Sequence, residues 1–187
     1  MSAGTQGRRW IGRALAGFAI AVIGVFVWAR RDLYAPLDAG SEAPDYQAVT
    51  LEGDSLSIQG ARGQVVLLNV WATWCRPCVR EMPAIQRLYE ALSPQGLTVL
   101  AVSVDNAALA LGDPAQAVRG FVDEFKLTFP ILLDPDNRIQ SVYQVTAMPT
   151  TYVIGRDGVI RQRFLGPREW DQPEFEAEIR ALLNGAQ

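Results

Sequence analysis

Short apolar runs alternate with amphipathic stretches over most of the chain, and this alternation predicts an α/β domain. Apolar runs at residues 64–72 and 97–104 are rich in β-favouring residues. Such runs are typical of strands buried on both faces, as in a parallel sheet. Apolar residues at helical spacing predict helices within residues 80–92 and 113–125. The order strand, helix, strand, helix predicts a sheet that is covered by helices.

Two hairpins frame this central part. Residues 46–51 and 55–58 are short strand-like pieces separated by Glu-Gly-Asp, which predicts an antiparallel pair. Residues 150–155 and 159–165, joined through Asp-Gly, predict a second pair. The remaining elements are an extended piece, a short helix and a closing helix, at residues 129–134, 137–145 and 171–185. The expected sheet is therefore mixed, with parallel strands on the N-terminal side and an antiparallel edge on the C-terminal side.

The N-terminal 31 residues follow a different pattern. An apolar run at residues 14–29 is flanked by arginines on both sides. Counted from Ile11, the run approaches the ~20 residues that a bilayer requires. A cleaved signal peptide is the alternative, but the bulky Trp28 and the arginine after Ala29 disfavour a cleavage site there. We therefore expect residues 1–31 to be an uncleaved signal anchor.

Either interpretation exports the rest of the chain. Residues 32–43 mix charge, Pro, Gly and Ser without periodicity and predict a linker, which leaves residues 44–187 as the folded domain. The expected location is the inner (cytoplasmic) membrane, with a single pass and the folded domain on the periplasmic or extracytoplasmic side. Disulfides form and persist in that compartment.

Composition removes several classes of function. The 187 residues carry a formal net charge of −3 and include no histidine. Without a basic surplus there is no electrostatic case for nucleic-acid binding. Without histidine there is no Cys-His protease pair, and a haem attached through Cys-x-x-Cys-His is excluded. A zinc site would need two carboxylates beside the two thiolates, so we expect no metal.

The candidate chemistry lies in the only two cysteines, Cys75 and Cys78, where a buried strand gives way to a helix. Unpaired N–H groups and the positive dipole end at a helix start stabilise a thiolate, which is the attacking species in disulfide exchange. Pro77 suits the first helical turn, and Arg76 adds a cation that favours the dithiol form. A purely structural disulfide is the alternative, but closing so short a loop stabilises little. The pattern therefore favours a redox-active disulfide with no other cofactor.

The stretch WATWCRPC resembles the active site of thioredoxins. The wider pattern, over most of residues 43–181, resembles the membrane-anchored thiol:disulfide oxidoreductases of the TlpA/ResA type. The resemblance implies a thioredoxin fold with the first hairpin as an N-terminal addition. It also implies that the helix near residues 115–125 belongs to an insertion.

The resemblance assigns roles to single residues. Cys75 matches the exposed nucleophile and Cys78 the buried resolving cysteine. Pro149 matches the proline that is cis in this fold, whose loop faces the disulfide. The residues expected to contact the substrate are Trp74, Arg76, Pro77 and Met148.

Two positions near the cysteines bear on proton transfer. Many thioredoxins have a buried aspartate where this chain has Asn69, which cannot exchange a proton. Glu81 follows Cys78 by three residues, as it often does in the TlpA/ResA group, and this spacing places it beside Cys78 on a helix. Glu81 is therefore a candidate acceptor for the Cys78 proton. A solvated glutamate at the helix start is the alternative.

The expected function is an extracytoplasmic thiol:disulfide oxidoreductase that reduces protein disulfides. Its electrons would come from an integral-membrane thiol donor, and its clients would belong to cytochrome c or copper-site maturation; these expectations rest on the resemblance. Two alternatives stay open. The two thiolates could hold Cu(I) in a copper metallochaperone, or the same fold could carry a thiol peroxidase.

Overall fold

The computed structural model describes residues 17–26, 37–108 and 112–185. The chain divides into two units, Met1–Pro36 and Leu37–Gln187. In the first unit, residues 17–26 are helical and their side chains are exposed. No helix within the described residues has the length and apolar character needed to cross a membrane. Most of the predicted anchor at residues 1–31 lies outside the described residues.

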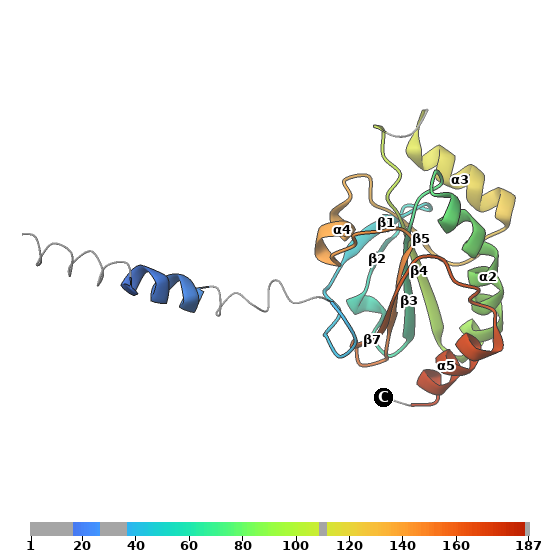
Figure 1. Ribbon diagram of the computed structural model, residues 1–187. Coiled ribbons are helices and arrows are strands. Elements are labelled where there is room, and N and C mark those ends of the chain that lie inside the picture. The colour runs from blue at the N-terminus through green and yellow to red at the C-terminus, as the bar shows by residue number, and fades with distance from the viewer. Residues whose placement is uncertain (1–16, 27–36, 109–111, 186–187) are drawn as a thin grey trace, which may run out of the picture. The chain divides into compact units, whose positions relative to one another are not determined.

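The second unit is built on a seven-stranded sheet in the order β2-β1-β5-β4-β3-β6-β7 (Figure 1). The strands are β1 (Gln47–Thr50), β2 (Ser55–Ser57), β3 (Val65–Trp71), β4 (Leu97–Ser103), β5 (Ile131–Leu133), β6 (Thr150–Ile154) and β7 (Ile160–Leu165). Strands β3, β4 and β5 are parallel, and β6 and β7 are antiparallel to their neighbours. The mixed sheet and both hairpins are confirmed. The first hairpin also pairs antiparallel with β5 through β1, so the sheet has an antiparallel edge on both sides.

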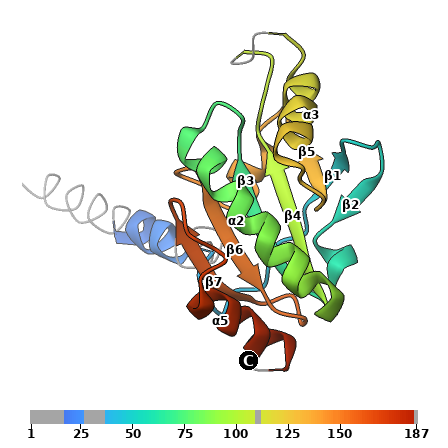
Figure 2. The same cartoon turned by 90° about the vertical axis from the view of Figure 1, so that its right-hand side faces the viewer.

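Helices cover both faces of this sheet. They are α2 (Arg76–Leu92), α3 (Pro114–Phe125), α4 (Arg138–Val142) and α5 (Pro173–Leu183), with 3-10 turns η2 (Gln59–Ala61) and η3 (Ser93–Gln95). Helices α2, α3 and α5 lie on one side of the sheet and α4 on the other (Figure 1), and Figure 2 shows the side that α2 and α3 cover. The Asp113 side chain caps α3 by accepting from the N–H of Ala115 at 3.0 Å. This agrees with the predicted helix start.

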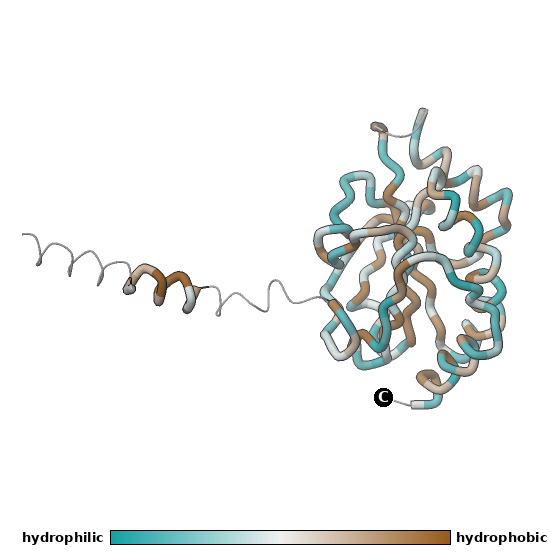
Figure 3. The backbone as a smooth tube through the Cα atoms, viewed as in Figure 1, coloured by the Kyte–Doolittle hydropathy of each residue, from teal (hydrophilic) through white to brown (hydrophobic). Residues whose placement is uncertain are grey.

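Strand β3 forms the centre of the core. All seven of its residues are buried, since it lies between β4 and β6 and beneath the helices. Figure 3 shows the apolar character of the central strands. Trp71 is fully buried and packs against Phe121 of α3, with ring centroids 5.0 Å apart. The predicted burial of this strand on both faces is confirmed.

The strand register brings three chain segments to one edge of the sheet. Trp71 pairs with Ser103 at the parallel ends of β3 and β4. Val70 pairs with Thr150 at the start of the antiparallel strand β6. The loop that follows β3, the residues that follow β4 and the residue that precedes Thr150 therefore meet at this edge. It is the edge at which parallel α/β sheets place their sites.

Part of the predicted linker at residues 32–43 belongs to the folded unit. The N–H of Gly40 donates to the carbonyl of Ile160, and the N–H of Ala43 donates to the carbonyl of Gly158, each at 2.8 Å. Ala43 is buried. The composition of this stretch is that of a loop, but its backbone finds partners in the β6–β7 hairpin.

Candidate active site

A disulfide between Cys75 and Cys78 occupies the junction of β3 and α2, with Cα atoms 5.2 Å apart. Cys75 has an extended backbone and is the N-cap of α2, where its Sγ accepts from the N–H of Cys78 at 3.4 Å. The predicted place of Cys75, at or before the first helical turn, is confirmed. Cys75 is 6% exposed and Cys78 is 0% exposed. Both cysteines are buried, and the one at the helix start is the more exposed of the two.

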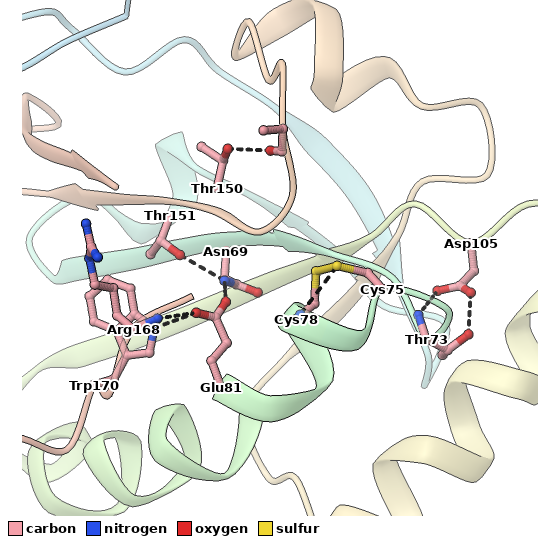
Figure 4. Close-up of a disulfide and its surroundings, with 11 residues drawn as sticks. Asn69, Thr73, Cys75, Cys78, Glu81, Asp105, Thr150, Thr151, Arg168 and Trp170 are labelled. Carbon is pink, nitrogen blue, oxygen red and sulfur yellow. Dashed lines mark hydrogen bonds between the residues drawn. A yellow bond between two sulfur atoms is a disulfide. The ribbon is translucent and has the colours of Figure 1, made fainter. Parts of the chain in front are cut away.

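The loop before the cysteines is held by a buried carboxylate that the sequence analysis missed. Asp105 is 4% exposed and lies two residues after β4. Its Oδ2 accepts from the N–H of Thr73 at 2.9 Å, and its Oδ1 accepts from the Thr73 hydroxyl at 2.5 Å (Figure 4). The Ser103 hydroxyl donates to the same carboxylate at 2.8 Å. Asp105 therefore fixes the turn that carries Trp74 and Cys75. The signal in the sequence was an aspartate at the end of a buried strand.

The side chains expected to contact substrate differ in exposure. Trp74 is 46% exposed and Arg76 is exposed, whereas Pro77 and Met148 are partly buried. The Met148–Pro149 peptide bond is cis, as predicted. Since Pro149 precedes the first residue of β6, it lies at the same sheet edge as the cysteines.

Glu81 is buried, at 2% exposure, in the helix that begins at Cys75. Its Oε1 accepts from the Asn69 side-chain amide at 2.8 Å. Its Oε2 accepts from the N–H of Arg168 and from the Trp170 indole N–H, each at 3.1 Å. Figure 4 shows Glu81 reaching from α2 to these donors. The alternative of a solvated glutamate is wrong, because the helix face at this position is covered by β3 and by the segment after β7.

The environment of Glu81 has opposing effects on its carboxyl group. Burial raises the pKa of Glu81 above its ordinary value of 4.5, and this effect is the largest. The hydrogen bonds from Asn69, Trp170 and the Arg168 N–H lower the pKa, as does the Arg168 charge. A carboxylate removed from water loses several kcal/mol of hydration, whereas hydrogen bonds to a charged group return about 1.5–3 kcal/mol each. Burial prevails, so Glu81 is poised to hold a proton at a higher pH than an exposed glutamate.

Asn69 links Glu81 to the sheet. It is fully buried, and its amide donates to Glu81 Oε1 and to the Thr151 hydroxyl, the latter at 2.9 Å. Its own Oδ1 has no hydrogen-bond partner. An orphaned buried carbonyl costs about 1–3 kcal/mol. Asn69 therefore serves the site as a hydrogen-bond donor through its side-chain NH2 group, and the side chain does not titrate.

Trp170 has a role that the sequence did not reveal. Its ring packs against Phe164 and Phe175 at centroid distances of 5.2 and 5.4 Å. The same ring also delivers its N–H to Glu81. Because 89 residues separate Trp170 from Glu81, local spacing gives no sign of this contact.

Asp134 is also buried at the end of a strand, but it serves a turn. Its Oδ2 accepts from the N–H of Ile139 at 2.7 Å, at the start of α4. Among the described residues, no group of three or more Cys, Asp or Glu side chains is placed to hold a metal ion.

Residues 39–163 match the AhpC/TSA family. The chain belongs to this family. Thioredoxin-like protein YneN of Bacillus subtilis is 37% identical over 176 residues, which cover 92% of this chain and 98% of that protein. Thiol-disulfide oxidoreductase ResA of Geobacillus kaustophilus is 39% identical over 127 residues, covering 68% of this chain and 69% of ResA.

A solved structure agrees with these relatives. StoA of Bacillus subtilis superposes with a TM-score of 0.60 and is 29% identical, over 72% of this chain and 97% of StoA. The expected resemblance to ResA-type proteins is confirmed, and the second unit has the thioredoxin fold. With the Cys75–Cys78 disulfide in place at the helix start, the chain is a thioredoxin-like thiol-disulfide oxidoreductase.

The raised pKa of Glu81 predicts how stability depends on pH. Between its ordinary value of 4.5 and the raised value, the folded protein holds more protons than the unfolded chain. The stabilising contribution of Glu81 to the free energy of unfolding is therefore complete at pH values below its ordinary pKa. It declines as pH rises towards the raised pKa, with a slope of up to about 1.4 kcal/mol per pH unit. Glu81→Gln should lack this decline in urea unfolding of the oxidised chain.

Glu124→Gln provides the control, because this substitution removes the same charge from an exposed position on α3. This variant should keep the pH dependence of the wild type. A Glu81→Gln protein whose stability falls with pH as steeply as the wild type would contradict the raised pKa.

Proposed function

We propose that this enzyme is tethered to the membrane, faces the extracytoplasmic side and reduces disulfides in client proteins. The observation that carries the proposal is the Cys75–Cys78 disulfide at the start of α2, with Cys75 the more exposed of the two cysteines. In this proposal an integral-membrane thiol donor regenerates the dithiol. The clients are cysteine pairs that must be reduced before cytochrome c or copper-site assembly.

The exchange reaction begins with the dithiol form of the enzyme. The Cys75 thiolate attacks one sulfur of the client disulfide, so that a mixed disulfide forms and the client's other sulfur leaves as a thiolate. Cys78 then loses its proton and attacks the Cys75 sulfur. The mixed disulfide breaks, the Cys75–Cys78 bond forms and the second client sulfur leaves. Two electrons have then passed to the client.

Glu81 takes the proton of Cys78 in this scheme. Cys78 is completely buried, so water cannot serve directly as its base. Glu81 lies one turn further along α2, and Figure 4 shows both side chains on the part of the helix that faces β3. A buried carboxyl with a raised pKa is a stronger base than an exposed one and is therefore better suited to accept the proton of a thiol.

The N-terminal helix supports the membrane part of the proposal. Within residues 17–26, Phe18 and Ile20 are each 71% exposed and Ile23 is 61% exposed. Figure 3 shows the apolar character of this helix. The flanking arginines at positions 8, 9, 13, 30 and 31 suit the two interfaces of a bilayer. A bilayer would cover these apolar side chains.

The division of labour between the cysteines predicts which variant traps clients. Cys78→Ser should accumulate a covalent complex between Cys75 and a client, because the resolving thiol is missing. Cys75→Ser should accumulate none, since Cys78 is buried. The measurement is non-reducing electrophoresis of the full chain purified from the membrane fraction, followed by identification of the captured proteins. Trapping by Cys75→Ser and not by Cys78→Ser would reverse the two assignments.

The topology has its own test. A reporter enzyme that works only outside the cytoplasm should be active when it is fused after Gln187. A matched fusion to a reporter that works only in the cytoplasm should be inactive. The opposite pair of results would exclude the proposed location and leave the exchange chemistry untouched.

A further inference from the structure

The site around Glu81 is a carboxylate-binding site assembled by other parts of the chain. Its donors are the Asn69 amide from β3, together with the Arg168 N–H and the Trp170 indole N–H from the segment after β7. None of the three comes from α2, which only delivers the carboxylate. All three are neutral N–H donors, so they bind the anion without the strong pKa depression of an ion pair.

A pocket of about 310 Å³ opens beside this site. Its lining consists of Arg80, Glu81, Pro167, Arg168 and Glu169. Neither cysteine nor Trp74 lines it. Arg80, Pro167, Arg168 and Glu169 are exposed, so the pocket connects with solvent, whereas Glu81 at its inner end is 2% exposed. Glu81 therefore lies one helical turn from the buried Cys78 and lines an opening that neither cysteine nor Trp74 lines.

We infer that this pocket is the port through which Glu81 exchanges its proton with solvent, and that it admits small monocarboxylates. The inference rests on the acid–base role of Glu81 proposed above. After Glu81 has accepted the proton of Cys78, the O–H bond breaks and the proton passes to water or a buffer base in the pocket. Glu81 is left as the carboxylate, ready for the next cycle. In this scheme the client can remain seated over the disulfide during the step, since neither cysteine lines the port.

The charges that face Glu81 lie at the port. The groups on β3 and β6 are the neutral Asn69 and Thr151. The charged groups that line the pocket are Arg80, Arg168 and Glu169. The two arginines favour loss of the proton and Glu169 opposes it. Reversing the charge of Glu169 should therefore favour the anionic form of any carboxylate at the inner end.

Chemical rescue tests the port. The reduced full chain is mixed with dithiodipyridine, a neutral disulfide, and the second release of thiopyridone reports the attack of Cys78 on the mixed disulfide. Glu81→Ala should slow this phase by about 10²-fold or more. Formate, added at constant ionic strength against chloride, should raise the rate of this phase in Glu81→Ala about tenfold, because the three N–H donors remain in place. The rate should level off at high formate concentration.

Glu81→Gln is the matched control for rescue. It is also slow, but its side chain fills the space that formate needs, so formate should have no effect. Glu169→Lys in the Glu81→Ala background should lower the half-saturating formate concentration severalfold. Glu124→Lys makes the same change in net charge on a residue that does not line the pocket, and should leave that concentration unchanged.

A second measurement keeps the Glu81 side chain and so does not depend on the folding of Glu81→Ala. In the otherwise wild-type chain, Glu169→Lys should move the pH–rate profile of the second phase to lower pH, and Glu124→Lys should not. An unshifted profile in Glu169→Lys would contradict the port.

The outcomes separate this inference from the proposed function. A Glu81→Ala protein as fast as the wild type would overturn the acid–base role itself. A slow Glu81→Ala protein that formate does not rescue would overturn the port and leave the role of Glu81 standing. Equal effects of Glu169→Lys and Glu124→Lys on rescue would show that formate enters by another route, which also overturns the port.

Discussion

The burial of one carboxyl group, that of Glu81, governs how the active site is organised. The group is held by donors from β3 and from the segment that follows β7, while its backbone belongs to α2. Three separate parts of the chain must be in place before the carboxylate is satisfied. An unsatisfied buried carboxylate is so costly that these parts are tied to one another. The same helix begins at Cys75, so the position of the disulfide follows from this arrangement.

The two buried carboxylates near the disulfide serve different purposes. Asp105 accepts from the backbone and side chain of Thr73, and so fixes the loop that presents Trp74. Glu81 accepts only from side-chain and backbone N–H groups that leave it free to take up a proton. A buried ion pair with arginine would have stabilised the charged form and held its pKa low. Neutral donors combined with burial instead hold the Glu81 carboxyl in place while its pKa is raised.

The sequence predicts what depends on local pattern and periodicity. Short-range signals in the sequence predict the burial of all seven residues of β3 and the start of α3 at Asp113. They also predict both hairpins. The cis bond before Pro149 was expected from the resemblance alone. The contacts of Glu81 with Arg168 and Trp170 span 87 and 89 residues. No spacing rule reaches that far, and the same holds for Asp105 and Thr73, whose contact depends on the register of β3 against β4. Residues 37–43 have the composition of a linker, and only their pairing with the β6–β7 hairpin places them in the fold.

The proposed coupling between the Glu81 carboxyl and Cys78 can be tested by carbon-13 NMR of that carboxyl. The full chain, labelled at glutamate carboxyl carbons, is titrated in its oxidised and reduced forms, and Glu81→Gln identifies the signal. We expect a titration midpoint above the ordinary pKa of 4.5 in the oxidised form. In the reduced form we expect a different midpoint, because the Glu81 carboxyl and the Cys78 thiol then titrate together. A signal that titrates near 4.5 and is the same in both redox states would contradict it.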